Sequence, residues 1–338
     1  MSEPGKDDGG DSMSKMAEII DATREHDRAL TRAVAVLSSG RPIALPTETV
    51  YGLAADATRG DAIASIYEVK GRPRFNPLIS HISDMAMAEA HGVFDPVSRR
   101  LAEAFWPGPL TLVVERAPSS TIHALATAGL DTLGLRMPAG FARDVIAAYG
   151  QPLAAPSANT SGRISPTTAA HVAGDLGSAI DLILDAGPAG IGLESTIVKV
   201  EGGTLRLLRP GGLDARDIED VAGQPLLRPE AAGSAIEAPG MMASHYAPGA
   251  AVRLDARSVE AGEALIRFGG VALPGEAQAV IVLDLSPSGD IREAAANLFS
   301  YMKTADATGA RTIAFSSIPR DGLGEAIRDR LERAAAPR

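Results

Sequence analysis

A stretch rich in proline and glycine, over Gly223–Gly249, is the feature that most limits how this 338-residue chain can fold. It holds four prolines and four glycines and shows little hydrophobic periodicity. Proline fixes φ and removes a backbone donor, so this stretch can form neither a long helix nor a central strand. We therefore expect a linker over residues 223–249 between two folding units, one over 26–222 and one over 250–338.

The first unit alternates short apolar runs with segments of helical periodicity, which is typical of an α/β domain. We expect helices near residues 27–39, 61–69, 142–149 and 167–174, with Asp61 capping the second. We expect strands at 42–45, 110–114, 133–137, 153–155 and 182–184, and a hairpin at 194–200 and 204–208. The Gly202-Gly203 pair supplies the turn of that hairpin. These elements predict a twisted mixed sheet.

The second unit predicts a smaller domain. Strands are expected at 252–254, 280–283 and 312–315, and helices at 259–267, 291–304 and 324–334. This alternation favours parallel strands in a three-layer, Rossmann-like arrangement.

The ends and the composition exclude several classes of protein. Residues 1–25 begin with a polar, acidic, glycine-containing run that lacks the apolar core of a signal peptide, so we expect a disordered tail there. No apolar run approaches the roughly 18 residues that a bilayer span needs, so we expect no membrane association and a cytoplasmic location. The chain has no cysteine, which excludes disulfides, thiol nucleophiles, iron–sulfur clusters and cysteine-based zinc sites.

The net charge and the absence of several common motifs exclude further classes of function. With 32 Lys+Arg against 42 Asp+Glu, the net charge of −10 argues against a broad nucleic-acid-binding face, although a local basic pocket remains open. The chain carries neither a P-loop nor the dinucleotide fingerprint, and it lacks the H-E-x-x-H and G-x-S-x-G motifs. A nucleotide, if one is bound, must therefore be held by a different kind of site.

One basic cluster is a candidate for that site. Lys70, Arg72 and Arg74 lie within five residues, on a segment interrupted by Gly71, Pro73 and Pro77. A rigid loop that concentrates guanidinium and ammonium groups suits a polyphosphate, because arginine binds phosphate through two parallel hydrogen bonds. The alternative is an ordinary solvated run of charges.

Three further segments place hydroxyl and amide side chains next to apolar strands. They are Pro46–Leu53, Pro156–Arg163 after the strand at 153–155, and the pair Glu194–Thr196 and Leu208–Gly212 flanking the hairpin. Ligands of open α/β sheets bind at such strand ends, although a polar turn with a helix cap would look the same. Arg136 lies inside an apolar strand, where a charge is costly unless it is paired or faces a ligand; an exposed sheet face is the alternative.

Seven segments in order resemble the threonylcarbamoyl-AMP synthase family, built on the YrdC-type domain. They read PTETVYGLAADA, KGRPRFNPLISHI, FWPGPLTLVV, LGLRMP, APSANTSGRISPT, ESTIVKV and LLRPGG, across roughly residues 30–215. The segment PGMMASHYAP and the α/β region after it resemble the long form of the family, which has an additional C-terminal domain.

The resemblance implies that L-threonine, bicarbonate (or CO₂) and ATP become threonylcarbamoyl-AMP, pyrophosphate and water. A downstream tRNA threonylcarbamoyl-transferase machinery would then modify adenosine 37 of tRNAs that read codons beginning with A, and tRNA itself is a further candidate ligand. Mg²⁺ would accompany ATP, held mostly by phosphate oxygens and water.

The resemblance also implies roles for individual residues. The catalytic residues would be Lys70 and Arg72, at the phosphates and the carbamate. The ATP-binding residues would be Arg72, Asn76, Thr132, Ser157, Ser165, Arg209 and Tyr246. The threonine-binding residues would be Thr49, His81, Arg136, Ser195 and the backbone at Ala155. For His81 a purely structural role is the alternative, and Trp106 is expected in the core.

The 239–248 segment is too specific for a passive spacer, because it holds two Met, a His and a Tyr. The resemblance implies that it lies over the nucleotide site with Tyr246 touching ATP; an ordinary linker is the alternative. For the chain as a whole, an RNA-binding module of the same fold without synthase activity is the rival interpretation. A carbamoyltransferase of the hydrogenase-maturation type is excluded, because it needs cysteine-rich zinc fingers.

Overall fold

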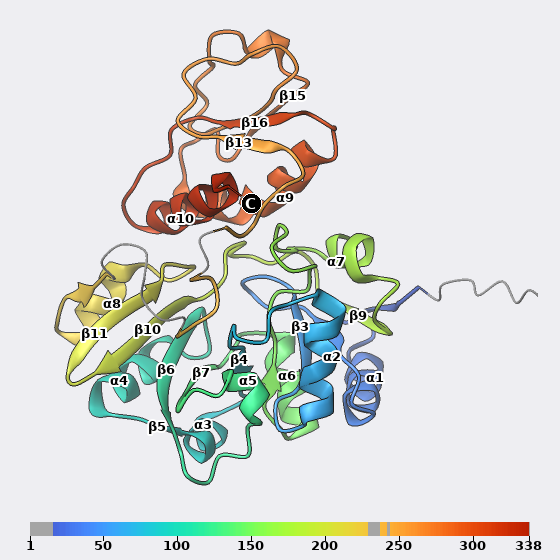
Figure 1. The fold of residues 1–338 in the computed structure, drawn as a ribbon, viewed down its shortest axis with the longest axis vertical. Coiled ribbons are helices and arrows are strands. Elements are labelled where there is room, and N and C mark those ends of the chain that lie inside the picture. Colours follow the sequence, from blue (N-terminus) through green and yellow to red (C-terminus); the bar gives the residue numbers. More distant parts are fainter. Residues whose placement is uncertain (1–15, 229–236, 242–243, 338) are drawn as a thin grey trace, which may run out of the picture.

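The computed structural model describes residues 16–228, 237–241 and 244–337, which form a large α/β domain and a smaller one above it in Figure 1. The large domain is built on one mixed sheet of twelve strands. In spatial order these are β1 (Glu18–Asp21), β9 (Leu182–Asp185), β2 (Ile43–Leu45), β3 (Gly52–Asp56), β8 (Leu153–Ala154), β4 (Ile79–His81), β7 (Thr132–Arg136), β6 (Leu110–Arg116), β10 (Thr196–Glu201), β11 (Thr204–Arg209) and β12 (Leu226–Leu227), with β5 (Gly92–Val93) paired to β6.

Eight helices belong to this sheet within the described residues. They are α1 (His26–Ser38), α2 (Gly60–Lys70), α3 (Met85–His91), α4 (Pro96–Phe105), α5 (Ala124–Thr127), α6 (Phe141–Tyr149), α7 (Ala169–Leu176) and α8 (Ala215–Ala222). Both faces of the sheet are buried, as alternate residues of β9 show: Leu182 and Leu184 pack with α1 and α6, whereas Ile183 packs with α2 and α7. The predicted mixed sheet is confirmed, including the hairpin of β10 and β11 around two glycines with positive φ. Trp106 is buried, as expected, and donates from Nε1 to the Leu110 carbonyl at 2.8 Å.

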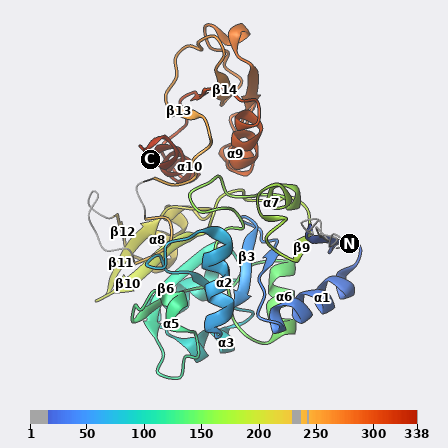
Figure 2. The ribbon, with the colours of Figure 1, turned by 45° about the vertical axis from the view of Figure 1, so that its right-hand side comes forward.

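Two predictions about the N-terminal part of the chain are wrong. The expected tail over 1–25 ends too late, because Glu18–Asp21 forms β1, the edge strand parallel to β9 (Figure 2). Its only fully buried side chain is Ile20, so a single apolar position decides the pairing, and composition cannot reveal it. Residues 1–15 lie outside the described residues. Asp61 does not cap α2: the helix begins at Gly60, and Arg59 is its N-cap.

The small domain has a sheet of four parallel strands in the order β13 (Ala251–Arg253), β16 (Thr312–Phe315), β14 (Ala264–Arg267) and β15 (Ile281–Asp284). Helices α9 (Ile291–Asp306) and α10 (Leu323–Ala335) cover the face that points toward the large domain (Figures 1 and 2). The other face is covered by irregular chain and a short 3₁₀ helix, η1 (Glu276–Gln278).

The helix predicted over 259–267 is therefore wrong. Residues 264–267 form the interior strand β14, whose Ala264, Leu265 and Ile266 are buried, and Val259 packs against Leu265 from the irregular layer. A short run that is apolar on both faces cannot be assigned to helix or strand by periodicity alone.

The two domains meet through an apolar contact. Ile164 and Leu193 of the large domain belong to the same buried cluster as Phe299 of α9 and Leu331 of α10. The stretch expected as a linker takes part in both domains: β12 extends the large sheet, Ala238 packs beside β4, and Tyr246 is buried in the interdomain cluster. Within the described residues, no helix combines the length and apolar character required to cross a bilayer.

Candidate functional site

Nine of the predicted residues line one small cavity in the large domain, of about 50 Å³. They are Thr49, Arg72, His81, Arg136, Ala155, Ser157, Ser195, Arg209 and Tyr246. Strand register explains part of this convergence. His81 at the end of β4 is paired with Arg136 at the end of the parallel strand β7, and with Leu153 of the antiparallel strand β8. Segments far apart in sequence therefore deliver their polar residues to one place.

Three cations in this region are buried without a carboxylate hydrogen-bond partner among the described residues. Arg72 and Arg209 line the cavity, and Lys70 lies behind its wall. Lys70 donates from Nζ to the carbonyl oxygens of Ser157, at 2.5 Å, and of Asn159. Burial, reinforced by the charge of Arg72, holds the pKa of Lys70 well below its usual value.

The two arginines are likewise held by neutral acceptors. Arg72 donates to the Pro77 carbonyl at 3.0 Å, and Arg209 donates to the Ser195 carbonyl at 2.8 Å. Burial lowers the pKa of Arg72 to about 10 and also lowers that of Arg209. Carbonyl oxygens orient a cation but do not neutralise it, so the cavity has a local excess of positive charge in an acidic protein.

Arg136 differs from these three because it is already paired. Its guanidinium donates to Glu48 Oε1 at 2.6 Å, to Thr49 Oγ1 at 2.8 Å and to the Gly108 carbonyl at 3.2 Å. The charged residue inside an apolar strand is therefore neither on an exposed face nor unpaired. It is fixed by a carboxylate from the loop after β2.

Glu194 forms the opposite wall of the cavity and joins the two domains. Its Oε1 accepts from Ser165 Oγ at 2.6 Å, and its Oε2 accepts from Arg330 Nε of α10 at 2.8 Å. Burial alone would raise the pKa of this carboxyl, but the charges of Arg330 and Arg209 outweigh that effect and lower it to about 2. Ser165 thus reaches the site through Glu194.

Several buried polar atoms around the cavity have no hydrogen-bond partner within the described residues. They are Glu48 Oε2, His81 Nδ1, Asn159 Oδ1 and His245 Nδ1. Buried polar atoms are nearly always satisfied in folded proteins, so such a group of exceptions fits a site that ordered water or a polar ligand completes. Both histidines are neutral near pH 7, because burial, with nearby cations, lowers the pKa of His81 and of His245 to about 3.

The connecting segment, residues 237–241 and 244–249, covers the cavity. Pro239, Gly240, His245 and Tyr246 all line it, and Tyr246 adopts φ +61°, the left-handed region that a non-glycine residue rarely enters. A Cβ on Gly240 would lie 2.7 Å from Arg209 Cδ, so the chain passes this closely over Arg209 only because residue 240 is glycine.

Two of the predicted residues lie at the margin of the cavity. The carbonyl of Asn76 accepts from Arg72 at 3.4 Å. Thr132 lines a separate cavity of about 10 Å³, whose wall shares Ile79 and Pro239 with the main one.

Sequence reasoning did not single out Glu48, Asn159, Glu194 or His245 as site residues. All four lie inside the segments that it quoted, one or two positions from a residue that it named. Only the tertiary contacts distinguish them from their neighbours.

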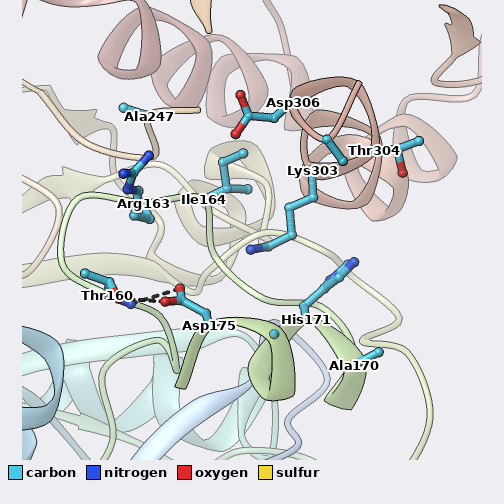
Figure 3. Close-up of a pocket in the computed structure, with 12 residues that line it drawn as sticks. Thr160, Arg163, Ile164, Ala170, His171, Asp175, Ala247, Lys303, Thr304 and Asp306 are labelled. Atoms are coloured by element: carbon cyan, nitrogen blue, oxygen red, sulfur yellow. Dashed lines mark hydrogen bonds between the residues drawn. The ribbon is translucent and has the colours of Figure 1, made fainter. Parts of the chain in front are cut away.

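A second cavity, of about 690 Å³, opens between α7, α9 and the loop at 160–164 (Figure 3). None of the predicted site residues lines it. Its two carboxylates are engaged by backbone amides: Asp175 accepts from Thr160 at 3.0 Å and Asp306 accepts from Gly249 at 2.9 Å.

Neither cavity has the donor set of a protein-held metal. Within the described ranges, no three His, Asp or Glu side chains are grouped so that they could bind an ion. The carboxylates at the smaller cavity, Glu48 and Glu194, are engaged by Arg136 and Arg330.

Known proteins resemble this chain in both of its domains. Residues 35–211 match the family model described as "Telomere recombination" (Sua5, YciO and YrdC), and residues 213–336 match the model described as "Threonylcarbamoyl-AMP synthase, C-terminal domain". The chain is 39% identical to the threonylcarbamoyl-AMP synthases of Bacillus subtilis, over 95% of this chain and 97% of that one, and of Pyrococcus abyssi, over 90% and 94%. A crystal structure of the P. abyssi protein Sua5 in complex with L-threonine superimposes with a TM-score of 0.80 at 36% identity, covering 90% of this chain and 94% of that one. The chain therefore belongs to the threonylcarbamoyl-AMP synthase family, in the form that carries both domains.

Proposed function

We propose that this protein is an L-threonylcarbamoyladenylate synthase, which converts L-threonine, bicarbonate or CO₂, and ATP into threonylcarbamoyl-AMP, pyrophosphate and water. The observation that carries the proposal is a set of buried cations without a carboxylate hydrogen-bond partner among the described residues: Arg72 and Arg209 line one covered cavity, and Lys70 donates to the Ser157 carbonyl of its wall. The relatives named as synthases and the threonine complex of one of them support the same conclusion.

The reaction asks for positioning and charge neutralisation more than for a covalent nucleophile. The threonine amine takes up CO₂ to give a carbamate, and a carbamate oxygen attacks the α-phosphorus of ATP while pyrophosphate leaves. Lys70 and Arg72 would hold the phosphates and the carbamate, with Arg209 beside them. Burying these three cations costs free energy in the empty site. The negative charge of the bound phosphates and carbamate would offset that cost, so the site is arranged in advance for an anionic substrate.

Threonine would lie on the side of the cavity formed by Thr49, His81, Arg136, Ser195 and the backbone at Ala155. Ser195 is already oriented, because its Oγ is 2.7 Å from Thr111 Oγ1 and accepts from Arg209 at 3.2 Å. Arg136 would meet the substrate carboxylate while still held by Glu48. Neutral His81 can offer one nitrogen as an acceptor or a donor without repelling the amine.

Mg²⁺ would enter with ATP. The two carboxylates at the cavity are engaged by arginines, which suits an ion held by phosphate oxygens and water rather than by a protein cage. When bound, the ion would neutralise part of the triphosphate charge and favour the departure of pyrophosphate.

The connecting segment would act as a cover over ATP, with Tyr246 against the nucleotide. Sites for small molecules and cofactors measure about 300–1,000 Å³. The cavity of about 50 Å³ is far smaller, so the segment must move aside for ATP to enter. Its return would exclude water from a mixed anhydride that hydrolyses readily.

The product would pass to a tRNA threonylcarbamoyl-transferase machinery that modifies adenosine 37 of tRNAs reading codons that begin with A. We infer that the reaction takes place in the cytoplasm, where ATP, threonine and tRNA meet.

The test is pyrophosphate release from purified protein with ATP and Mg²⁺. We expect release only when L-threonine and bicarbonate are both present. Release that ignores threonine would indicate a general nucleotidase. Absence of release together with tight RNA binding would favour the alternative, an RNA-binding module of the same fold.

A further inference from the structure

The side chain of Arg330 joins the small domain to the nucleotide site. It projects from α10, is 0% exposed and is the largest fully buried side chain within the described residues. Nε donates to Glu194 of the cavity wall at 2.8 Å, and Nη1 donates to Asp329 at 2.6 Å. The two carboxylates compensate this deeply buried charge, while Nη2 has no hydrogen-bond partner among the described residues.

The same guanidinium lies against Tyr246. Its Cζ is 5.1 Å from the centroid of the Tyr246 ring, which stacks on Phe299 with centroids 5.6 Å apart and planes at 25°. The hydroxyl end of the ring points toward the cavity, since a Cβ built on Gly240 would lie 3.2 Å from it. Arg330 and Phe299 therefore pack against the ring of Tyr246, while its hydroxyl group lies at the cavity.

Backbone contacts fix the residues on either side of Tyr246. The His245 amide donates to the Arg333 carbonyl of α10 at 3.2 Å, and the Ala247 amide donates to the Gly162 carbonyl of the large domain at 2.8 Å. Arg333 Nε in turn donates to Asp329, at 2.9 Å, the carboxylate that anchors Arg330. One connected group of contacts thus runs from α10 through Tyr246 to the wall of the cavity.

We propose that Arg330 is a positioning residue for the reaction: by bridging Glu194 to Asp329 it holds Tyr246, and with it the connecting segment, in place over the nucleotide site. The proposal gives the C-terminal domain a role in the chemistry, because that domain decides how well the site is sealed. Loss of Arg330 leaves the large-domain pocket residues in place but shifts the segment toward its open state. Water then reaches the bound intermediate and cleaves the anhydride to AMP and N-carboxythreonine, which releases CO₂ and threonine.

The experiment is a single turnover with enzyme in excess over ATP, quenched and analysed for AMP and threonylcarbamoyl-AMP. We expect Arg330→Gln to raise the ratio of AMP to intact intermediate about tenfold, which corresponds to about 1.4 kcal/mol. Arg330→Lys should fall between this variant and the original chain. The matched control is Arg328→Gln, on the same helix, whose partner Asp255 lies within the small domain at 3.1 Å; it should leave the ratio unchanged. A merely structural defect would reduce the amount of active protein but not this ratio.

A second measurement does not depend on the enzyme turning over substrate. Amide hydrogen exchange at His245 and Ala247 in the full chain should accelerate in Arg330→Gln and not in Arg328→Gln. If Arg330→Gln does not fold, Asp329→Asn, which removes one of the two anchors of Arg330, should show both effects at smaller size.

The outcomes separate this inference from the proposed function, on which its catalytic arm rests. A parent chain that makes no intermediate would overturn the proposed function, while the exchange measurement would still decide whether Arg330 holds Tyr246. An intermediate formed normally, with an unchanged AMP ratio in Arg330→Gln or an equal rise in Arg328→Gln, would overturn the role of Arg330 alone.

Discussion

Three buried cations of the large domain and one of the small domain are held in opposite ways, whereas Arg136 of the large domain is paired with Glu48. In the large domain, Lys70, Arg72 and Arg209 donate to neutral acceptors, mainly backbone carbonyl oxygens, and have no carboxylate partner among the described residues. In the small domain, Arg330 is equally deep but bridges two carboxylates, Glu194 and Asp329. A buried charge without a carboxylate partner itself lowers the stability of the folded protein. A buried ion pair such as that of Arg330 lowers it only when one partner is removed. The comparison therefore separates groups kept for a ligand from a group kept for the interface.

Replacing Arg330 should produce the largest loss of stability. Arg330→Gln leaves Glu194 buried without its partner, and breaking a buried pair in this way costs about 3–5 kcal/mol. Urea unfolding measures it. Arg328→Gln, which loses a partly exposed pair, should change the free energy of unfolding by less than about 1 kcal/mol. Equal effects would remove the distinction between the two kinds of arginine.

Replacing Lys70 or Arg72 should cost activity rather than stability. Lys70→Met and Arg72→Ala each lose a charge-assisted contact to substrate worth about 1.5–3 kcal/mol, so turnover should fall at least about tenfold. The free energy of unfolding should not fall with it, because Lys70 donates only to backbone carbonyls and has no carboxylate hydrogen-bond partner to lose. Arg74→Ala is the control, since Arg74 is exposed in the same loop. Near-normal kinetics in the first two variants would restore the interpretation of this cluster as a solvated run of charges.

The pH dependence of stability tests the two buried histidines. With pKa values of about 3 in the folded protein, His81 and His245 take up protons in the unfolded chain first, at their ordinary pKa near 6.5. Their contribution to stability is therefore present above pH 6.5 and is lost as the pH falls toward 3, by up to about 1.4 kcal/mol per unit for each histidine.

Unfolding at pH 7, 6 and 5 separates this effect from that of Glu194, which, with its pKa lowered to about 2, loses its contribution only below its ordinary value of 4.5. Burial also lowers the pKa of His91 and of His171, so both add to the slope of the original chain, and the contribution of one histidine comes from comparing variants. His245→Asn should reduce the slope by about one proton. An unchanged slope in His245→Asn would mean that His245 is not held neutral.

The smallest expected effect concerns the threonine side of the cavity. Ser195→Ala removes a neutral hydrogen bond worth about 0.5–1.5 kcal/mol, so KM for threonine should rise several-fold while KM for ATP changes less. Arg136→Ala should act in the same direction, and the double variant Arg136→Ala with Glu48→Gln shows how much of its effect comes from a carboxylate left unpaired. Loss of ATP binding with threonine binding retained would reverse our division of the pocket.

Much of the site could be predicted because its chemistry is concentrated in short segments. Lys70 and Arg72 stand out as cations on a loop broken by proline, and Ser157 and Ser195 as hydroxyls next to apolar strands. Glu48 and Glu194 could not be separated from their neighbours, because a carboxylate becomes distinctive only through the arginine it meets. Those arginines, Arg136 and Arg330, are 88 and 136 positions away.

The fold shows the same division. Alternating apolar runs determine that both domains are α/β, and the absence of cysteine determines that none of their stability comes from disulfides. The position of β14 as an interior strand, the pairing of β1 with β9 and the burial of Tyr246 between two domains were decided by tertiary structure. Local sequence determines which residues favour a strand, a turn or a charge. Which of them are buried together depends on contacts between distant segments, whose free energy no single segment contains.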